Sequence, residues 1–238
     1  MASDIPAFLV SSAVISTLVF LFSVWILIHY AIYSLNIQKN KLKYSLITIL
    51  ILLGWFGIVF FLGRTGFFAI NPLLATNILL GFIVLFVILK KVYASSIIEN
   101  ITDKISVPWI IGIQTYRIVG YGFLIFYKMK LLPGIFAFSA GFGDILVGVT
   151  APFVAVIYYL KKPYAKKLAI IWNIIGIADL VIAILIGIFA YPRPYQVLPV
   201  EVSTNIISLY PLVLIPLFAV PLAILLHFFS LRTIRKMK

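Results

Sequence analysis

Long apolar stretches separated by short polar connections run through the whole chain. At 1.5 Å per residue, each stretch is about long enough to cross the ~30 Å hydrocarbon core of a membrane as a helix. Strands of a membrane barrel alternate lipid-facing and lumen-facing residues, whereas segments such as 46–53 and 78–89 are apolar on every side. The pattern predicts an all-α bundle of seven transmembrane helices. They are expected near Ile5–Tyr33, Tyr44–Leu62, Pro72–Leu89, Val107–Phe126, Pro133–Leu160, Leu168–Ala190 and Ile206–Leu231.

The composition agrees with a polytopic membrane protein, because 64% of the 238 residues are hydrophobic and only 11% are charged. The connections are too short for a separate soluble domain, so residues 1–238 are expected to form a single transmembrane domain. Asp4 stands where a signal peptide would carry basic residues, and we expect the first helix to be retained. The sequence has no cysteine, which excludes disulfides, thiolate metal sites and iron–sulfur clusters. We expect no cofactor and no bound metal.

The basic residues predict the orientation of the helices. Of the 19 Lys and Arg residues, 14 lie in connections on one side, and Arg117 is left inside the membrane. The other side holds Arg64, Lys128, Lys130 and Arg193. Basic loops stay in the cytoplasm, so we expect a multi-pass plasma-membrane protein with its N-terminus outside and its C-terminus cytoplasmic. The net charge of +13 is spread over short connections, which favours anionic lipid headgroups over nucleic acid as the partner.

Three charged residues lie near the centre of separate apolar stretches: Arg117, Asp144 and Asp179. Counted from the ends of the expected helices, each lies ten or eleven residues deep, within about one turn of mid-membrane. An ionisable side chain at that depth costs at least ~2.5 kcal/mol on insertion scales, and it normally faces a partner or a cavity. We therefore expect the three residues to form one buried polar site.

One arginine can hold both carboxylates, because its planar guanidinium offers a fork of donors and stays protonated. The cluster then carries one uncompensated negative charge, which a proton on one carboxyl or a bound cation would neutralise. Such a site indicates binding or translocation of a small solute, a cation or a proton. The alternative is a salt-bridge network that only fixes helix packing in a structural or accessory membrane subunit.

Other polar and small residues accompany these charges. Gln114 lies one helical turn before Arg117 and is expected to line the same cavity. Asn173 shares a broad helix face with Asp179 and is expected to orient a ligand. A seam of small residues beside Asp144 permits close helix approach; it comprises Ala137, Gly141 and Gly148. The first three helices carry no charge at mid-depth, and they are expected to form a scaffold or the surface of a homo-oligomer.

Four strings stand out in the second half of the chain. They are Gln114-Thr-Tyr-Arg117-Ile-Val-Gly120, Leu132-Pro-Gly-Ile-Phe-Ala-Phe-Ser-Ala-Gly-Phe-Gly-Asp144-Ile-Leu-Val-Gly148, Trp172-Asn-Ile-Ile-Gly-Ile-Ala-Asp179-Leu180 and Pro211-Leu-Val-Leu-Ile-Pro-Leu-Phe-Ala-Val-Pro-Leu-Ala-Ile-Leu-Leu-His227. Together they resemble an uncharacterised family of small bacterial seven-helix membrane proteins. The resemblance covers about half of the chain and implies no activity. It adds His227 to the candidate site.

Two enzymatic or redox alternatives stay open beside a non-enzymatic protein. Gly141-Phe-Gly-Asp144 is similar to the GxGD signature of intramembrane aspartyl proteases, whose chemistry needs two carboxylates that share a proton. Asp179 would be the second carboxylate, but the companion in those proteases precedes the signature, and the neighbouring arginine favours two ionised carboxylates. His29 and His227 would be the axial ligands of one haem, although both are expected at the membrane interface, near the cytoplasmic ends of their helices.

Overall fold

The computed structural model describes residues 6–35, 40–70, 82–83, 87, 90, 96–192 and 196–236. Every regular element within these residues is helical. In chain order they are α1 (Ala7–Tyr33), α2 (Lys41–Arg64), α3 (Phe67–Ile70), α5 (Ser96–Lys104), α6 (Val107–Ile113), η2 (Gln114–Gly120), α7 (Tyr121–Lys128), α8 (Gly134–Tyr159), α9 (Ala165–Phe189), η3 (Thr204–Ser208), η4 (Ile215–Ala219) and α10 (Val220–Lys236).

Six helical segments in the described residues are long and apolar enough to cross a membrane. They are Ala7–Tyr33, Lys41–Arg64, Val107–Lys128, Gly134–Tyr159, Ala165–Phe189 and Ile215–Lys236. Each overlaps one of the seven stretches expected from the sequence. The remaining expected span, at 72–89, falls almost wholly outside the described residues. The six segments indicate a multi-span, all-helical membrane protein.

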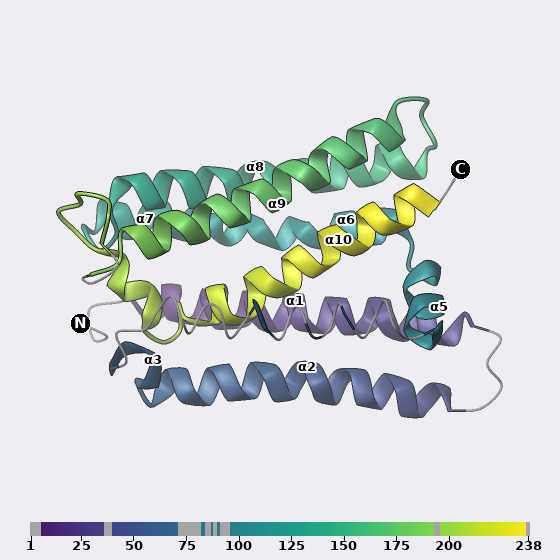
Figure 1. Ribbon diagram of the computed structural model, residues 1–238, viewed down its shortest axis with the longest axis horizontal. Helices are drawn as coiled ribbons and strands as arrows, with labels where there is room; N and C mark the ends of the chain where they lie inside the picture. The colour runs from purple at the N-terminus through teal and green to yellow at the C-terminus, as the bar shows by residue number, and fades with distance from the viewer. Residues whose placement is uncertain are drawn as a thin grey trace.

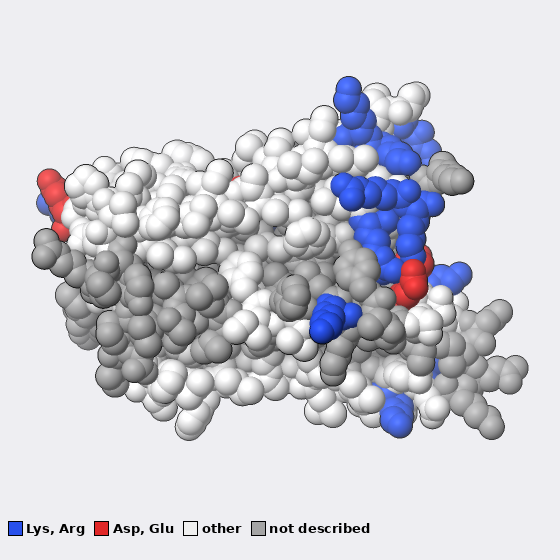
Figure 2. Space-filling view, viewed as in Figure 1, with Lys and Arg blue, Asp and Glu red and all other residues white. Residues whose placement is uncertain are grey.

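The helices run between two ends of the bundle (Figure 1). One end holds the start of α1, the short helix α3 and the turn between α7 and α8, and we call it the α1 end. The opposite end holds α5, the turn between α8 and α9, and the C-terminus. Lys and Arg side chains gather at this opposite end in the space-filling view (Figure 2). We call it the basic end; the elements that lie there carry Lys104 at the end of α5, Lys161 and Lys162 between α8 and α9, and Arg232, Arg235 and Lys236 at the end of α10.

The surface helix α5 is tied to the end of α10 by ion pairs. Glu99 accepts hydrogen bonds from Arg232 at 2.8 Å and from Lys236 at 2.7 Å, and Asp103 accepts one from Lys236 at 2.7 Å. The hydrogen bond from Lys236 holds the pKa of the Glu99 carboxyl below its usual value. The acidic side chains of α5 therefore neutralise part of the basic end.

The last span is the centre of the bundle, although it comes at the end of the chain. Of its most apolar window 89% is buried, against 22–39% for the other five spans. Its side chains join those of α1 and α2 in the largest cluster of buried hydrophobic residues.

The last helix begins later than the sequence predicted. The expected start was Ile206, but Thr204–Ser208 forms only a short 3₁₀ turn, and the continuous span begins at Ile215. Pro211 and Pro216 lack the N–H that a regular helix requires, so the backbone between them cannot complete an α-helical ladder. The span instead opens with η4, a five-residue π-helical segment.

A third proline also disturbs the ladder of this span. Pro221 leaves the carbonyl of Leu217, four residues earlier, without its helical donor. The indole N–H of Trp55, on α2, donates to that carbonyl at 3.0 Å. A buried carbonyl left unpaired would cost ~1–3 kcal/mol. The otherwise apolar α2 therefore supports the irregular part of the central helix.

The span at 107–128 is not a continuous α-helix, contrary to the regular helix expected there. Its middle segment η2 is a 3₁₀ helix, which has 3.0 residues per turn and places every third residue on one line. Gln114, Arg117 and Gly120 occupy such positions, and all three are buried. Long 3₁₀ stretches inside a helix are uncommon and often mark strained or functional segments. The central charged residue lies at the middle of this one.

Candidate functional site

Arg117 joins the two partly buried aspartates of the spans. Its Nε donates to Oδ1 of Asp144 at 2.7 Å, and its Nη2 donates to Oδ2 of Asp179. The arginine comes from η2, Asp144 from α8 and Asp179 from α9, so one ion-pair cluster ties three spans together. The Arg117 side chain is only 1% exposed. A charge buried this deeply needs opposite charges in direct contact, and the two carboxylates supply them.

The third nitrogen of the guanidinium points toward α9 and α10. Nη1 of Arg117 donates to the carbonyl of Gly176 at 3.4 Å and lies 3.5 Å from Nε2 of His227. An arginine has five N–H donors and no acceptor, so Nε2 of His227 must be the acceptor in this contact. Four acceptors thus surround the guanidinium. Its position is fixed by neighbours from α8, α9 and α10.

A chain of neutral hydrogen bonds continues from the histidine. Nδ1 of His227 donates to Oδ1 of Asn173 at 2.9 Å, since Nε2 already accepts. The Asn173 amide in turn donates to Oγ of Ser230 at 2.9 Å and to the carbonyl of Ala169 at 2.7 Å. This order of donors assigns a neutral imidazole with its proton on Nδ1. The chain connects the ion-pair cluster to the half of α10 nearer the basic end.

Each side chain that contacts the arginine lies against a glycine of another helix. A Cβ added at Gly120 would overlap Asp144, one at Gly143 would overlap Asp179, and one at Gly176 would overlap the His227 ring. Only glycine leaves room for these side chains where the helices approach closely. The expected seam on α8 is also present. Cβ atoms added at Gly141 and Gly148 would crowd the η2–α7 segment.

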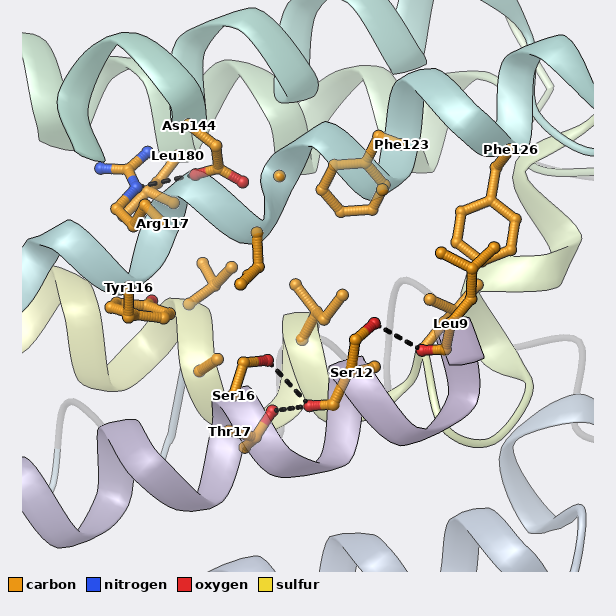
Figure 3. A pocket seen from close by; sticks show the side chains of 18 residues that line it. Leu9, Ser12, Ser16, Thr17, Tyr116, Arg117, Phe123, Phe126, Asp144 and Leu180 are labelled. Atoms are coloured by element: carbon orange, nitrogen blue, oxygen red, sulfur yellow. Dashed lines mark hydrogen bonds and ion pairs between the residues drawn. The ribbon is translucent and has the colours of Figure 1, made fainter. Parts of the chain in front are cut away.

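A cavity of about 60 Å³ adjoins the cluster (Figure 3). Arg117 and Asp144 lie at one end of it, and Leu9 and Phe126, near the start of α1 and the end of α7, lie at the other. The cavity therefore extends from the middle of the bundle toward the α1 end. Along α1 its wall carries three hydroxyl side chains, those of Ser12, Ser16 and Thr17.

A second cavity, of about 40 Å³, lies beside the first. Its walls are nearly all apolar and include Phe136, Gly187 and Ile207, which also lie toward the α1 end. Both cavities share Asp144 in their lining, whereas Asp179 lines neither. The two carboxylates of the cluster therefore have different surroundings.

The family model described as Domain of unknown function (DUF8737) matches residues 73–235. The match covers more than half of the chain and includes the whole ion-pair cluster. The chain belongs to the DUF8737 family. No curated protein and no solved structure matches it. This match to a family of unknown function is consistent with the resemblance to an uncharacterised family noted in the sequence. It says nothing about a bacterial origin or about the four sequence strings.

Within the DUF8737 segment, Gln114 lies apart from the other candidate residues. Its Nε2 donates to the carbonyl of Ala223 at 3.2 Å, and it lines neither cavity beside Asp144. The expectation that it shares the cavity with Arg117 is wrong, because its amide reaches the backbone of α10 one turn before His227. Its Oε1 is buried, and no described residue donates to it.

The structure also corrects the expected location of His227. The ring is fully buried at 0% exposure, between Arg117 and Trp172, whose ring centroid lies 5.2 Å away. An interfacial position was expected from its place near the end of the span, but the surrounding helices cover α10 along almost its whole length. His29 belongs to a separate cluster on α1 and α2, with Ser45 Oγ 2.7 Å from its Nδ1. This arrangement gives no support to a haem held by both histidines.

The protease alternative also loses support from the geometry. An aspartyl protease dyad needs two carboxylates that share one proton. Here the guanidinium of Arg117 binds one oxygen of each carboxylate, so the arginine takes the place of the shared proton. Asp144, Asp179 and Arg117 form an arginine-bridged triad rather than a catalytic dyad.

Several site residues were not found from the sequence. The hydroxyls of Ser12 and Ser16 follow an i, i+4 spacing on α1, which would have placed them on one helix face. Ser230 closes the polar chain from His227, and Tyr116 lines the larger cavity beside Arg117. The expectation that the first three helices form only scaffold is wrong for α1, because its hydroxyl side faces the cavity.

Proposed function

We propose that this DUF8737 protein binds or translocates a small solute or cation across a membrane, coupled to a proton. The observation that carries the proposal is that two carboxylates share one guanidinium at the centre of the bundle. With a neutral His227, one arginine and two ionised aspartates leave a formal charge of −1. Uncompensated charge is costly at mid-membrane, so a proton or a cation is the natural complement of this cluster.

The size of the cavities favours a small species. Sites for drug-sized ligands typically enclose ~300–1,000 Å³, whereas the two cavities beside Asp144 measure about 60 and 40 Å³. One water molecule needs ~10–15 Å³ of such space, so the larger cavity accommodates a few waters or a small ion. A larger solute would require the helices to separate. In that event Asn173 and His227 would be among the first polar groups available to orient it.

We also propose seven spans, with the N-terminus outside and the C-terminus in the cytoplasm of the plasma membrane. The gathering of Lys and Arg at one end supports the cytoplasmic assignment of that end. The elements α3 and α5, which flank the expected span at 72–89, lie at opposite ends of the bundle (Figure 1). That arrangement supports one further crossing between them.

The proposal is tested by measuring ion flux with the purified protein in liposomes. A pH-sensitive dye inside the vesicles reports proton movement while gradients of Na⁺, K⁺ or Li⁺ are imposed in turn. We expect the wild type to move protons or one of these cations, and the Asp144→Asn variant to fall to the rate of empty liposomes while it remains folded. The Glu201→Gln variant removes a carboxylate outside the spans and should keep the wild-type rate. A wild type that matches empty liposomes under every gradient would overturn the proposal.

A purely structural role is the second candidate, and the surroundings of the arginine favour it. Four acceptors already contact the guanidinium, as expected of a cluster that fixes helix packing. A structural role predicts that Asp144→Asn mainly lowers thermal stability. It also predicts that the neutral triple variant Arg117→Gln, Asp144→Asn, Asp179→Asn regains stability and all biological activity, because a neutral set of similar volume can replace a buried ion network. Lost flux in the stable triple variant would favour transport.

A further inference from the structure

The two carboxylates of the cluster differ in what they face. Oδ1 of Asp144 accepts the bond from Arg117, while its Oδ2 has no donor among the described residues, and this side chain lines both cavities. Asp179 is 12% exposed but lines neither cavity, and one of its oxygens packs against Gly143. The two cavities beside the cluster therefore open onto Asp144 and not onto Asp179. Of the two carboxylates, Asp144 has the route to water.

We propose that Asp144 is the proton-exchanging carboxyl of the cluster, that its proton arrives through water from the α1 end, and that Asp179 is the permanent counter-ion of Arg117. This inference rests on the proposed function and deepens it. A hydronium ion in the larger cavity gives its proton to Oδ2 of Asp144, and a water molecule remains. Arg117 then keeps one ionised partner, Asp179, and the cluster becomes neutral. Release is the reverse transfer.

The α1 wall of the cavity is suited to water and to cations that donate hydrogen bonds. Ser12 donates its hydroxyl proton to the carbonyl of Leu9 at 3.0 Å, and Ser16 and Thr17 donate theirs to the carbonyl of Ala13 at 3.1 and 2.7 Å. A hydroxyl has one proton and two lone pairs, so toward the cavity these three side chains can only accept. Water or hydronium, which donates, is matched by such a wall (Figure 3).

A proton fits the site better than a metal cation. Hard cations are held by several oxygen ligands at once, among them carboxylates, but the cavity offers one carboxylate beside three uncharged hydroxyls, and that carboxylate is already bonded to the cationic Arg117. The titratable groups packed around Asp144 and its partner are Tyr116 from η2, Asp179 from α9 and His227 from α10. The lining of the cavity contributes none from α1, α7 or η4.

The first test records infrared difference spectra of the protein in nanodiscs as the pH is stepped, in H₂O and in D₂O. It needs no transport, so its failure is distinguishable from failure of the proposed function. We expect one carboxylic acid band that appears on acidification and shifts on deuteration, is lost in Asp144→Asn, and persists in Asp179→Asn. A band lost only in Asp179→Asn, or a wild type with no titrating side-chain carboxyl beyond those that Asp4→Asn, Glu99→Gln, Asp103→Asn and Glu201→Gln remove, would overturn the inference.

The second test avoids the charged cluster and keeps the inference testable if its variants do not fold. The chain contains no cysteine, so single cysteines can be placed without further changes. Ser16→Cys lies on the cavity wall, while Ile15→Cys, one residue earlier on the same helix, lies on the exposed outer face. Silver ion, a small thiol-reactive cation, should modify Ser16→Cys from the α1 end of oriented vesicles and leave Ile15→Cys unmodified. Equal rates for both, or reaction of Ser16→Cys only from the basic end, would overturn the water route.

Discussion

Two apolar spans, α2 and α8, differ in the room around the glycines near their middle. On α2, a Cβ added at Gly54 or Gly57 would meet nothing within 4 Å among the described residues. On α8, a Cβ at Gly148 would lie 2.6 Å from the backbone N of Ile118, and one at Gly143 would overlap the carboxylate of Asp179. Gly54 and Gly57 are therefore replaceable positions on an outer helix, whereas Gly148 and Gly143 of α8 make room for η2 and for a charged side chain.

The same contrast holds for burial and charge. Only 22% of the most apolar window of α2 is buried, and among the described residues it is Trp55 that makes its side-chain hydrogen bond to the central helix. The α8–α9 pair carries both aspartates and, together with η2 and α10, encloses the arginine. The comparison indicates that the polar centre depends on tight packing of the second half, while α2 acts from outside.

The largest expected loss of stability comes from removing the arginine of the polar centre. Arg117→Gln leaves two carboxylates buried together without a positive charge, and breaking a buried ion pair from one side typically costs ~3–5 kcal/mol. We expect the variant to misfold or to lose most of its thermal stability, measured as retained monodisperse protein after heating in detergent. Arg64→Gln, at the end of α2, should stay close to the wild type. A fully stable Arg117→Gln protein would break the comparison, because the centre would then tolerate an unpaired cluster.

A smaller effect is expected when only the room for a carboxylate is removed. Gly143→Ala places a Cβ where Asp179 lies, and overpacking of a tight interior costs ~1–3 kcal/mol. The matched change on α2, Gly57→Ala, meets open space and should be neutral or slightly stabilising, because alanine favours helix by ~0.5–1 kcal/mol over glycine. Both are read from the same thermal unfolding assay. Equal stability of the two variants would contradict the contrast between the spans.

The sequence predicted the spans and the charged cluster because both follow from hydropathy and depth alone. Each of the six spans seen in the described residues overlaps an expected one, and Arg117, Asp144 and Asp179 meet as expected from their depth. Oppositely charged groups at the same membrane depth have few alternatives to pairing with each other. Their contact can therefore be predicted without knowing how the helices pack.

The remaining features depend on contacts between distant parts of the chain. The start of the last helix was placed too early. A proline in the sequence shows which backbone donor is missing, but it does not show whether the helix continues with another donor in its place or begins only after the proline. The hydroxyls of Ser12 and Ser16 were passed over, since serines in spans commonly bond their own backbone and give no sign of which helix they face. Gln114 was assigned to the wrong neighbour for the same reason, as only the packing of α10 decides where its amide points.

A third prediction sharpens the supporting role of α2. Trp55→Phe removes the N–H that pairs the Leu217 carbonyl and should cost about 1 kcal/mol. Pro221→Ala restores an N–H that can donate to the same carbonyl, so the tryptophan change should cost little in that background. The four proteins form a double-mutant cycle in thermal unfolding. Trp109→Phe, on an exposed side chain, is the control. Purely additive effects would mean that the indole does not replace the missing helical donor.

The smallest effect is expected at the basic end, where the charges are exposed instead of enclosed. The hydrogen bond from Lys236 lowers the pKa of Glu99, so the ionised form is favoured in the folded protein. A lowered pKa contributes stability at pH values above the carboxyl's usual pKa of 4.5, and this contribution is lost as the pH falls through the lower pKa of the folded protein.

Glu99→Gln should therefore reduce the midpoint of thermal unfolding by no more than about 2 °C near pH 7. The difference should vanish in acid and shrink in high salt, since exposed ion pairs are screened. Glu201→Gln, which removes a carboxylate outside the spans, is the control over the same pH series. A large loss in Glu99→Gln that persists in acid would show that α5 is held by packing around this residue, and that the basic end shares the tight construction of the buried centre.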